Sequence, residues 1–480
     1  DDAGMGKTTQ VALLLRALID LGRVSSVLIV TPASSLCKWE RVLRRLGVEF
    51  GVLEGADVSS FHCNVCLVTV DRAKGEEYLR ELEERKWDLV VVDRAHVVKR
   101  GRKRFNVSAV LSNAGGYVLT VLPQYIKQQG DSRRDKDRAT LVRLFREDKF
   151  QRSRRTDAKT CDGADALPPL RRWVVRVKVG GGVGGLEELK KRRMRELVGE
   201  KFETFMALLH KLRGGGWKRL AVFTSNRDMA KWLFDNLAQG CVRSGQDGDA
   251  LADCGWLGVV YLSGVAQGGC GDLPEKFLEE HDVAVLVVPE AAADAIDFSA
   301  FNVVVNYDVA KKPETYIWRV TRVWNVGQRA GEVLVVDMAA EGAEYDKYVR
   351  LVREMREVFR EDFADIFANV ATEVYEAFRG DIRIAEADAE LKTALGAEEG
   401  ALYAFLGAPK LAEEHTDLSA VMTEGGGSTI WVTNEEFRRR VESIVEANRL
   451  KAFIEVKAVE CATAWLKESG FKIVQGYQRL

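Results

Sequence analysis

The sequence has 480 residues, of which 46% are hydrophobic and 30% charged, with a formal net charge of −1. A chain of this length exceeds one hydrophobic core and is expected to form about three domains. Since no run of about 18 apolar residues occurs, no helical membrane span is predicted.

The first 125 residues alternate short apolar runs with helical patterns. The helical patterns cover residues 35–46 and 75–85. The apolar runs, which we predict to be buried strands, are 27–31, 66–70, 89–92 and 117–121. Continuous runs rich in Val, Ile and Leu that alternate with helices are typical of a parallel sheet covered on both faces.

Residues 126–199 are rich in charge and glycine, and Gly180–Gly185 suggests a flexible connector. The alternating pattern then returns with a helix over 201–212. The strands predicted after it are 220–224, 259–262, 283–288, 303–307 and 333–337. They indicate a second doubly wound sheet.

The pattern over residues 341–378 is helical and amphipathic, and a helical pattern from Ile454 precedes a strand that starts near Phe471. We therefore expect an α/β protein with two parallel-sheet lobes and a mostly helical C-terminal extension. The expected divisions are 1–145 for the first lobe, 146–199 for a linker or insertion, 200–340 for the second lobe and 341–480 for the extension.

A phosphate-binding loop is predicted at the start of the chain, where Gly4-Met5-Gly6-Lys7-Thr8-Thr9 precedes the apolar helix Val11–Leu21. Glycines let backbone N–H groups approach phosphate, and the helix N-terminus adds a favourable dipole. Lys7 would reach the β- and γ-phosphates, and the Thr8 hydroxyl would bind Mg²⁺. Asp1 stands where the general pattern has its first glycine, and the alternative is a glycine-rich turn that only caps a helix.

A second candidate group is Asp93, which directly follows the apolar run 89–92. A carboxylate at the end of a strand, after a phosphate loop in the same sheet, is typical of a Mg²⁺-holding residue. The sequence thus predicts a site for ATP and Mg²⁺, with Thr8 and Asp93 as metal ligands.

Eight segments follow one another in a fixed order along the chain: Asp1–Thr8 with Gln10, Leu28–Leu36 with Trp39, Asp93–His96, Leu119–Pro123, Arg154–Thr156 with Leu167–Pro169, Arg219–Thr224, Asn306–Asp308 with Pro313, and Trp318–Gln328. Together these segments resemble the motifs of the Swi/Snf family of helicase-like ATPases. The resemblance covers roughly residues 1–350, and the order of eight motifs makes it specific.

The resemblance implies two RecA-like lobes that bind ATP between them and track along nucleic acid. Gly4, Gly6, Lys7, Thr8, Thr9 and Gln10 would contact the nucleotide. Lys7, Asp93, Arg319 and Arg322 would be catalytic, with the two arginines stabilising charge on the transferring phosphoryl group. Double-stranded DNA is the expected partner in preference to RNA, protein partners in a larger complex are expected, and no membrane is implied.

Five positions depart from the family pattern in its catalytic motifs. Arg94 replaces the glutamate that activates water, Asn325 replaces a third arginine, and Trp318 replaces a glutamine. In the fifth motif, Asp294 and Ala295 replace glutamate and glycine. An arginine does not accept a proton at neutral pH.

These departures leave two interpretations open. The first is a nucleic-acid-dependent ATPase that translocates on or remodels duplex DNA, in which either another carboxylate takes over from the missing glutamate or hydrolysis is weak or lost. The second is a catalytically impaired, nucleotide-gated DNA-binding or scaffold subunit. The C-terminal extension is expected to be a helical brace over 354–378 on the second lobe and, beyond it, a packing module, with an incomplete nuclease-like module as the alternative.

Charge and cysteine usage add two expectations. The basic clusters 99–104, 152–155 and 190–195, with an acidic stretch after Asp337, fit either a nucleic-acid groove or solvated surfaces. The eight scattered cysteines favour a reducing, intracellular setting. Cys63 and Cys66, beside His62, have C-x-x-C spacing, yet no second pair follows, so ordinary thiols are preferred to a metal or redox site.

The chain opens inside a motif and without an initiator Met. Its first residues lack the basic start and the apolar segment of a signal peptide. We therefore expect the sequence to be part of a longer protein.

Overall fold

The computed structural model describes residues 4–53, 63–73, 82, 84–93, 115–121, 158, 160, 165–178, 186–244, 250–262, 275–290, 293, 296–359, 370–395, 419–422, 431–448, 450 and 471–474. The chain divides into two compact units, Asp1–Ala166 with Ala408–Leu480, and Leu167–Gly407. Among the described residues, no helix is both long enough and apolar enough to cross a membrane.

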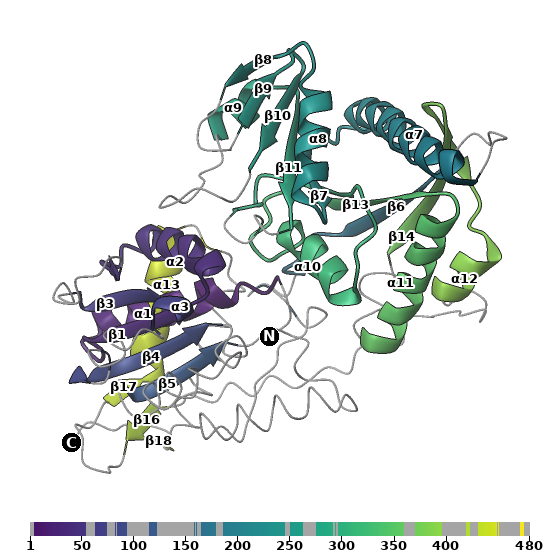
Figure 1. The fold of residues 1–480 in the computed structure, drawn as a ribbon. Coiled ribbons are helices and arrows are strands. Elements are labelled where there is room, and N and C mark those ends of the chain that lie inside the picture. The colour runs from purple at the N-terminus through teal and green to yellow at the C-terminus, as the bar shows by residue number, and fades with distance from the viewer. Residues whose placement is uncertain are drawn as a thin grey trace. The chain divides into compact units, whose positions relative to one another are not determined.

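The first unit contains a parallel sheet of five strands in the order β2-β3-β1-β4-β5 (Figure 1). The strands are β1 (Val27–Thr31), β2 (Gly51–Val52), β3 (Val65–Thr69), β4 (Trp87–Asp93) and β5 (Gly115–Val121). The helices that accompany them are α1 (Lys7–Asp20), α2 (Ala33–Arg45) and α3 (Val70–Ala73). Every residue of β1 is buried, as the apolar run predicts for a central strand of a covered parallel sheet.

The C-terminal part of the chain returns to the first unit. It contributes an antiparallel sheet in the order β17-β16-β18, with β16 (Ser419–Met422), β17 (Trp431–Thr433) and β18 (Phe471–Val474). Helix α13 (Asn434–Ala447) contacts α1. The strand predicted to start near Phe471 is confirmed.

The second unit is built on a sheet of ten strands in the order β15-β14-β6-β13-β12-β7-β11-β10-β9-β8. Its strands are β6 (Leu170–Val177), β7 (Arg219–Thr224), β8 (Val242–Ser244), β9 (Ala250–Asp253), β10 (Leu257–Tyr261), β11 (Val283–Pro289), β12 (Val303–Asn306), β13 (Val333–Ala340), β14 (Ala371–Phe378) and β15 (Asp381–Ala385). Its helices are α7 (Leu186–Gly214), α8 (Arg227–Leu237), α9 (Glu275–Glu280), α10 (Pro313–Val323), α11 (Ala343–Phe359) and α12 (Ala389–Leu395).

The strands of this sheet from β14 to β10 are parallel, and antiparallel strands complete it at both ends. The core strands β11, β12 and β13 are buried along their whole length. The predicted α/β architecture with two RecA-like parallel-sheet units is confirmed.

Three segments differ from their predicted structure. Strand β6 lies within the range 146–199 that was expected to be a linker, and α7 begins at Leu186 instead of near Lys201. The helix expected over 354–378 is wrong in its last part, because β14 pairs with β6 over Ala371–Ala377. Pairing with a long neighbouring strand outweighs the helix propensity of alanine and glutamate there.

Candidate nucleotide-binding site

The predicted phosphate loop leads directly into α1. Gly4 and Gly6 have φ angles of 83° and 73°, in the left-handed region that favours glycine. Gly6 is the N-cap of α1 and has no side chain with which to cap the helix. The first N–H groups of α1 are therefore arranged as in helix N-termini that bind anions.

The side chains around this loop have different environments. Lys7 and Thr9 are partly exposed, whereas Thr8 is 5% exposed and Gln10 only 2%. Gln10 Nε2 donates to the carbonyl oxygen of Met5 at 2.5 Å, so this side chain holds the loop from its buried side. Sequence analysis assigned Gln10 to the nucleotide, and in the structure its side-chain amide contacts the backbone of the loop.

Asp93 ends β4 and is 6% exposed. Its Oδ2 atom accepts hydrogen bonds from Thr31 Oγ1 at 3.2 Å and from Trp39 Nε1 at 3.0 Å. Thr31 ends the neighbouring parallel strand β1, and Trp39 lies on α2. Two donors from separate elements thus fix the orientation of this carboxylate.

The loop and Asp93 lie at the same edge of the sheet. Helix α1 ends at Asp20, and a short connection leads into β1 at Val27, so α1 runs antiparallel to the strands. Its first turn therefore lies toward the edge where β1 and β4 end. In parallel α/β sheets, this carboxyl edge is where ligands bind.

In the second unit, three polar residues follow the carboxyl ends of neighbouring parallel strands. They are Ser225 after β7, Glu290 after β11 and Asp308 near the end of β12. Both Ser225 N and Ser225 Oγ donate to Asp308 Oδ2 at 2.8 Å. Sequence analysis did not assign these residues to a site, although they lie in or beside segments that resemble family motifs.

Arg319 of α10 lies among these residues and is 0% exposed. Its Nε donates to Glu290 Oε1 at 3.0 Å, and Nη2 donates to the same oxygen and to Asp308 Oδ1. Its Nη1 donates to the Asp308 carbonyl oxygen at 2.8 Å and to Asn306 Oδ1 at 3.4 Å. A guanidinium has five N–H donors, and each donor of Arg319 has an acceptor within the second unit.

Arg322, one turn further along α10, has a different environment. It is partly exposed, and its guanidinium carbon lies 4.5 Å from the ring centroid of Trp318. Trp318 in turn makes an edge contact with Phe223 of β7. The structure thus separates the two predicted catalytic arginines into one enclosed and one partly exposed side chain.

Asn325, which stands where the family has a third arginine, lies just after the C-terminal end of α10. Its Nδ2 donates to the carbonyl oxygens of Arg322 at 2.7 Å and Val323 at 3.3 Å, and its Oδ1 accepts from Gly327 N. The side chain satisfies carbonyl groups that the helix end leaves open. The departure from the family pattern therefore has a local structural role.

A buried polar network lies behind Arg319. Asn306 Nδ2 donates to Asp337 Oδ1 at 2.7 Å, and the hydroxyls of Tyr316 and Tyr348 donate to Asp337 Oδ2 at 2.8 and 2.9 Å. Burial raises the pKa of Asp337, although the charge of Arg172 and these hydrogen bonds oppose the shift. Burial, with the nearby Asp337 carboxylate, raises the pKa of Tyr316 and of Tyr348.

Two comparisons of sequence place the chain among known proteins. The family "Helicase conserved C-terminal domain" matches residues 200–327. An uncharacterized ATP-dependent helicase of Bacillus subtilis (strain 168), YqhH, is 26% identical over 104 residues, which are 22% of this chain and 19% of that protein. The RNA polymerase-associated protein RapA of Yersinia pestis (strain Pestoides F) is 26% identical over 168 residues, or 31% of this chain and 16% of that protein.

Over the matched residues, the chain is similar to helicase-like proteins of superfamily two. The resemblance to the Swi/Snf family is confirmed at this level, and the chain spans less than a fifth of the length of these two relatives. Among solved structures, Dbp5 of S. cerevisiae bound to RNA and ADP BeF3 is similar, with 15% identity and a TM-score of 0.48. The similarity covers 79% of this chain and 84% of that chain.

Several helicase-motif positions lie outside the described residues. They include Arg94, Asp294, Ala295 and the basic clusters 99–104 and 152–155. The cluster 190–195 lies on α7.

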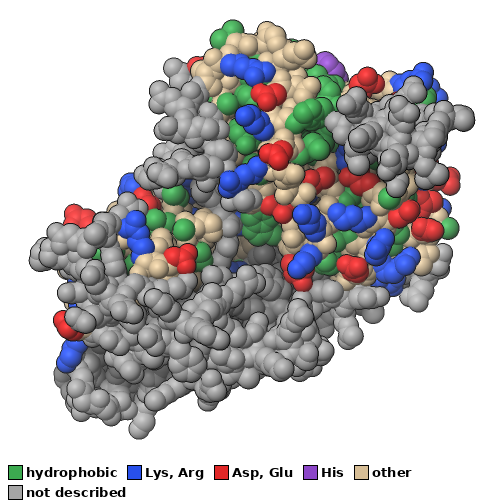
Figure 2. Space-filling view, in the orientation of Figure 1, with side chains coloured by type: hydrophobic (Ala, Val, Ile, Leu, Met, Phe, Trp, Pro, Cys, Tyr) green, Lys and Arg blue, Asp and Glu red, His purple; other side chains and the backbone are tan. Residues whose placement is uncertain are grey.

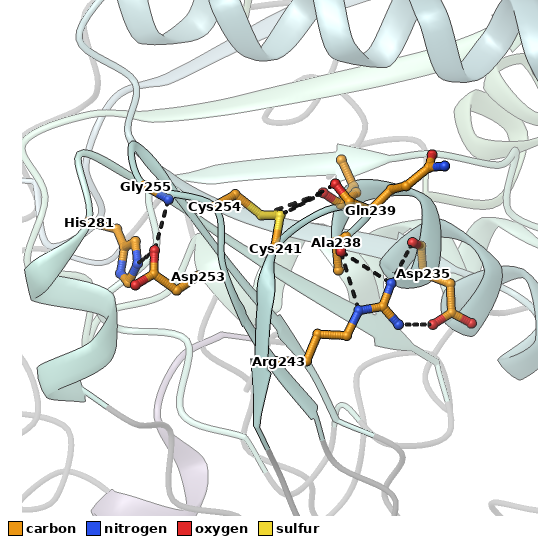
Figure 3. The surroundings of a disulfide bond; sticks show 10 residues. Asp235, Ala238, Gln239, Cys241, Arg243, Asp253, Cys254, Gly255 and His281 are labelled. Atoms are coloured by element: carbon orange, nitrogen blue, oxygen red, sulfur yellow. Dashed lines mark hydrogen bonds and ion pairs between the residues drawn. A yellow bond between two sulfur atoms is a disulfide. The ribbon is translucent and has the colours of Figure 1, made fainter.

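The expectation of ordinary thiols is wrong for Cys63 and Cys66. The structure contains the disulfides Cys63–Cys66 and Cys241–Cys254, and Cys37 is free. Figure 3 shows Cys241–Cys254 at the base of the β8–β9 hairpin. In the same view Asp253 is turned toward His281, with Asp253 Oδ1 3.1 Å from His281 Nε2. Hydrogen bonds from Gly255 N and His281 hold the pKa of Asp253 below its usual value. Within the described residues, no group of acidic, His and Cys side chains is arranged to hold a metal ion.

Proposed function

We propose that this chain is a Swi/Snf-like, nucleic-acid-dependent ATPase that translocates on or remodels duplex DNA. One observation carries the proposal. A glycine-rich loop with two left-handed residues opens α1 at the sheet edge where the oriented carboxylate of Asp93 lies. This arrangement suits a nucleoside triphosphate and its metal ion.

The residues present fit ATP with Mg²⁺. The Thr8 hydroxyl and the Asp93 carboxylate are hard oxygen ligands of the kind Mg²⁺ prefers. Mg²⁺ would supply neutralisation of phosphate charge when it is bound. The backbone of Gly4 to Thr9 would bind the phosphates, Lys7 would orient the terminal ones, and Gln10 would keep the loop in shape through Met5.

The two arginines of α10 receive different roles. Arg322 is proposed to stabilise charge on the transferring phosphoryl group, because this residue is partly exposed. Arg319 is proposed to organise the ends of β11 and β12 around Glu290 and Asp308. This assignment refines the sequence-based one, which gave both arginines to the nucleotide.

Duplex DNA is the proposed partner because the order of the motifs resembles Swi/Snf proteins. The surface charge does not distinguish duplex DNA from other partners, since Figure 2 shows basic side chains mixed with acidic ones over the second unit. RapA is described as RNA polymerase-associated, which favours a protein partner in a larger complex. An intracellular setting is part of this proposal, since ATP and DNA are its substrates.

A second candidate function is a nucleotide-gated, non-catalytic subunit of a larger assembly. The second unit favours it in one respect. Of the three arginine positions in the last motif, Arg319 is enclosed and Asn325 caps a helix, which leaves Arg322 to act on the nucleotide. Loss of one arginine finger lowers the rate of hydrolysis by a factor of about 10³–10⁵ where it has been measured.

ATP turnover with and without duplex DNA tests both candidates. Wild type is compared with Lys7→Ala, with Arg94→Glu and with Lys231→Ala, a control at an exposed position on α8. DNA-stimulated turnover that Lys7→Ala abolishes and Lys231→Ala retains supports the ATPase. Nucleotide binding without turnover, and turnover gained in Arg94→Glu, supports the non-catalytic subunit. A wild-type protein that binds no nucleotide contradicts both.

A further inference from the structure

Three helices of the first unit are linked by arginine side chains. Arg16 of α1 donates through Nη1 to the carbonyl oxygens of Leu46 at 3.0 Å and Gly47 at 2.5 Å. These carbonyls lie at the C-terminal end of α2, where open backbone acceptors favour a cation. Gly47 has a φ of 64°, in the left-handed region that favours glycine, and a Cβ atom there would approach Arg16 Nη1 to 3.1 Å.

The next two contacts involve α13, which lies about 400 residues further along the chain. Arg45 at the end of α2 donates to the carbonyl oxygen of Asn448, just after α13, at 2.9 Å. Arg440 of α13 donates through Nε to Asp20 Oδ2 at 2.6 Å, and Asp20 is the last residue of α1. Arg16, Arg45 and Arg440 therefore form a closed ring of contacts from α1 to α2, from α2 to α13 and from α13 to α1.

Apolar packing accompanies this arginine ring. Helix α13 buries Phe437, Val441, Ile444 and Val445, which are spaced as one face of a helix. Helix α1, which α13 contacts, buries Leu13, Leu14, Leu15 and Leu18. The ion pair is itself partly shielded, with the Asp20 side chain 14% and the Arg440 side chain 36% exposed.

We propose that α13 positions the nucleotide site by fixing the far end of α1, with Arg440 as the positioning residue. The proposal rests on the function proposed above, because it assigns α1 to the phosphates. Helix α1 has 14 residues and is a rigid rod of about 21 Å, with the phosphate loop at one end and Asp20 at the other. A shift or tilt at Asp20 is transmitted to the N–H groups at the loop.

Phosphate binding depends on the position of these N–H groups to within about 0.5 Å. The C-terminal segment thus acts on nucleotide affinity without touching the nucleotide. This role differs from the brace on the second lobe that was expected for residues 354–378, and α13 belongs to the first unit.

Two measurements on the full chain test the proposal. Hydrogen exchange reports the opening of residues 7–20, and titration with a fluorescent ATP analogue and Mg²⁺ reports affinity well below the melting temperature. The variants are Arg440→Ala, Arg440→Lys and the control Arg438→Ala. Arg438 lies on the same helix but pairs with Glu442 of α13 itself, with 57% of its side chain exposed.

Arg440→Ala is expected to speed exchange in α1 and to weaken nucleotide binding, each by about two- to fivefold, as for a partly exposed ion pair. Arg440→Lys should recover part of both effects, and Arg438→Ala should match wild type. Unchanged exchange in Arg440→Ala overturns the contact. Faster exchange with unchanged nucleotide affinity overturns the positioning role. If wild type binds no nucleotide, the proposed function and the positioning role fail together, and exchange alone then decides whether the ring stabilises α1.

Discussion

Trp39 Nε1 donates a hydrogen bond to Asp93 Oδ2 at 3.0 Å and thereby connects α2 to the carboxyl end of β4. Trp39 is 0% exposed, so no solvent water takes the place of its indole N–H as a donor to Asp93. Because Thr31 donates to the same oxygen, Asp93 is held from one side by two elements. The orientation of the proposed metal ligand therefore depends on the packing of α2.

Trp39→Phe should destabilise the first unit and weaken nucleotide binding in Mg²⁺. The substitution keeps most of the ring but removes a donor to a charged acceptor, a loss of about 1.5–3 kcal/mol. Urea unfolding measures the stability, and titration with ATP at several Mg²⁺ concentrations measures the affinity.

Trp87→Phe is the matched control for Trp39. Its Nε1 donates to the Leu82 carbonyl oxygen at 3.1 Å, and its side chain is 2% exposed in the same unit. It should cost about 0.5–1.5 kcal/mol and leave the Mg²⁺ dependence unchanged. Equal effects of the two variants on Mg²⁺ dependence would contradict a specific role of Trp39.

Arg319→Ala should lower the free energy of unfolding of the second unit more than Arg322→Ala does. Removal of Arg319 leaves the carboxylates of Glu290 and Asp308 without their cation, and breaking a buried pair costs about 3–5 kcal/mol. Since both carboxylates are partly exposed, we expect the lower end of this range. Urea unfolding followed by tryptophan fluorescence measures the difference.

Arg322→Ala should cost less than about 1 kcal/mol in stability, as for most surface positions, and should reduce any ATP turnover by about 10³-fold or more. Turnover per folded molecule separates the two arginines. If Arg319→Lys keeps full stability and loses turnover while Arg322→Ala retains it, the proposed roles are reversed.

The sequence predicts the apolar strands of the second unit but not its charged ones. Strands β11, β12 and β13 each begin with a continuous apolar run and were predicted in place, because a strand covered on both faces is largely apolar. Strands β6 and β14 were missed. Each strand carries arginine or glutamate side chains, which form ion pairs only when the two strands lie side by side. Arg171–Glu373 and Arg176–Glu376 are such pairs.

The candidate site shows the same limit. The glycine-rich loop before α1 and the place of Asp93 at the end of β4 are predictable, because each depends on adjacent residues within one motif. The enclosure of Arg319 is not, because Glu290 and Asp308 come from two other segments that meet only at the carboxyl edge of the sheet. The contact of α13 with α1 is equally invisible, since it joins residues 20 and 440.

Reduction of the Cys241–Cys254 disulfide should lower the stability of the second unit. The bond closes a loop with a sequence separation of 13, and a loop of about 15 residues gains roughly 3 kcal/mol in the chain-entropy model. Cys241→Ser with Cys254→Ser should therefore lower the melting temperature under oxidising conditions and abolish the effect of a phosphine reductant on this unit. Cys37→Ser is the control, because Cys37 is free. A reductant effect on the second unit that persists in the double variant would contradict the assignment.

The stability of the second unit should fall steeply in alkali because of Tyr316 and Tyr348. Burial is the largest cause that raises the pKa of both phenols, followed by the charge of Asp337. In the unfolded chain a tyrosine ionises near pH 10. Above that pH the unfolded state loses protons that the folded state keeps, so the free energy of unfolding falls by about 1.4 kcal/mol per pH unit for each buried tyrosine.

Tyr348→Phe removes one of these two groups and should make the alkaline slope shallower by about 1.4 kcal/mol per pH unit. At neutral pH the same variant loses a hydrogen bond to Asp337 and should be less stable by about 1–3 kcal/mol. Urea unfolding at intervals between pH 8 and 11.5 gives both values. Asp337→Asn is the companion variant: it removes the carboxylate but leaves the phenols buried, so most of the alkaline slope should remain. A slope that disappears in Asp337→Asn would show that the carboxylate, and not burial, keeps the two phenols protonated.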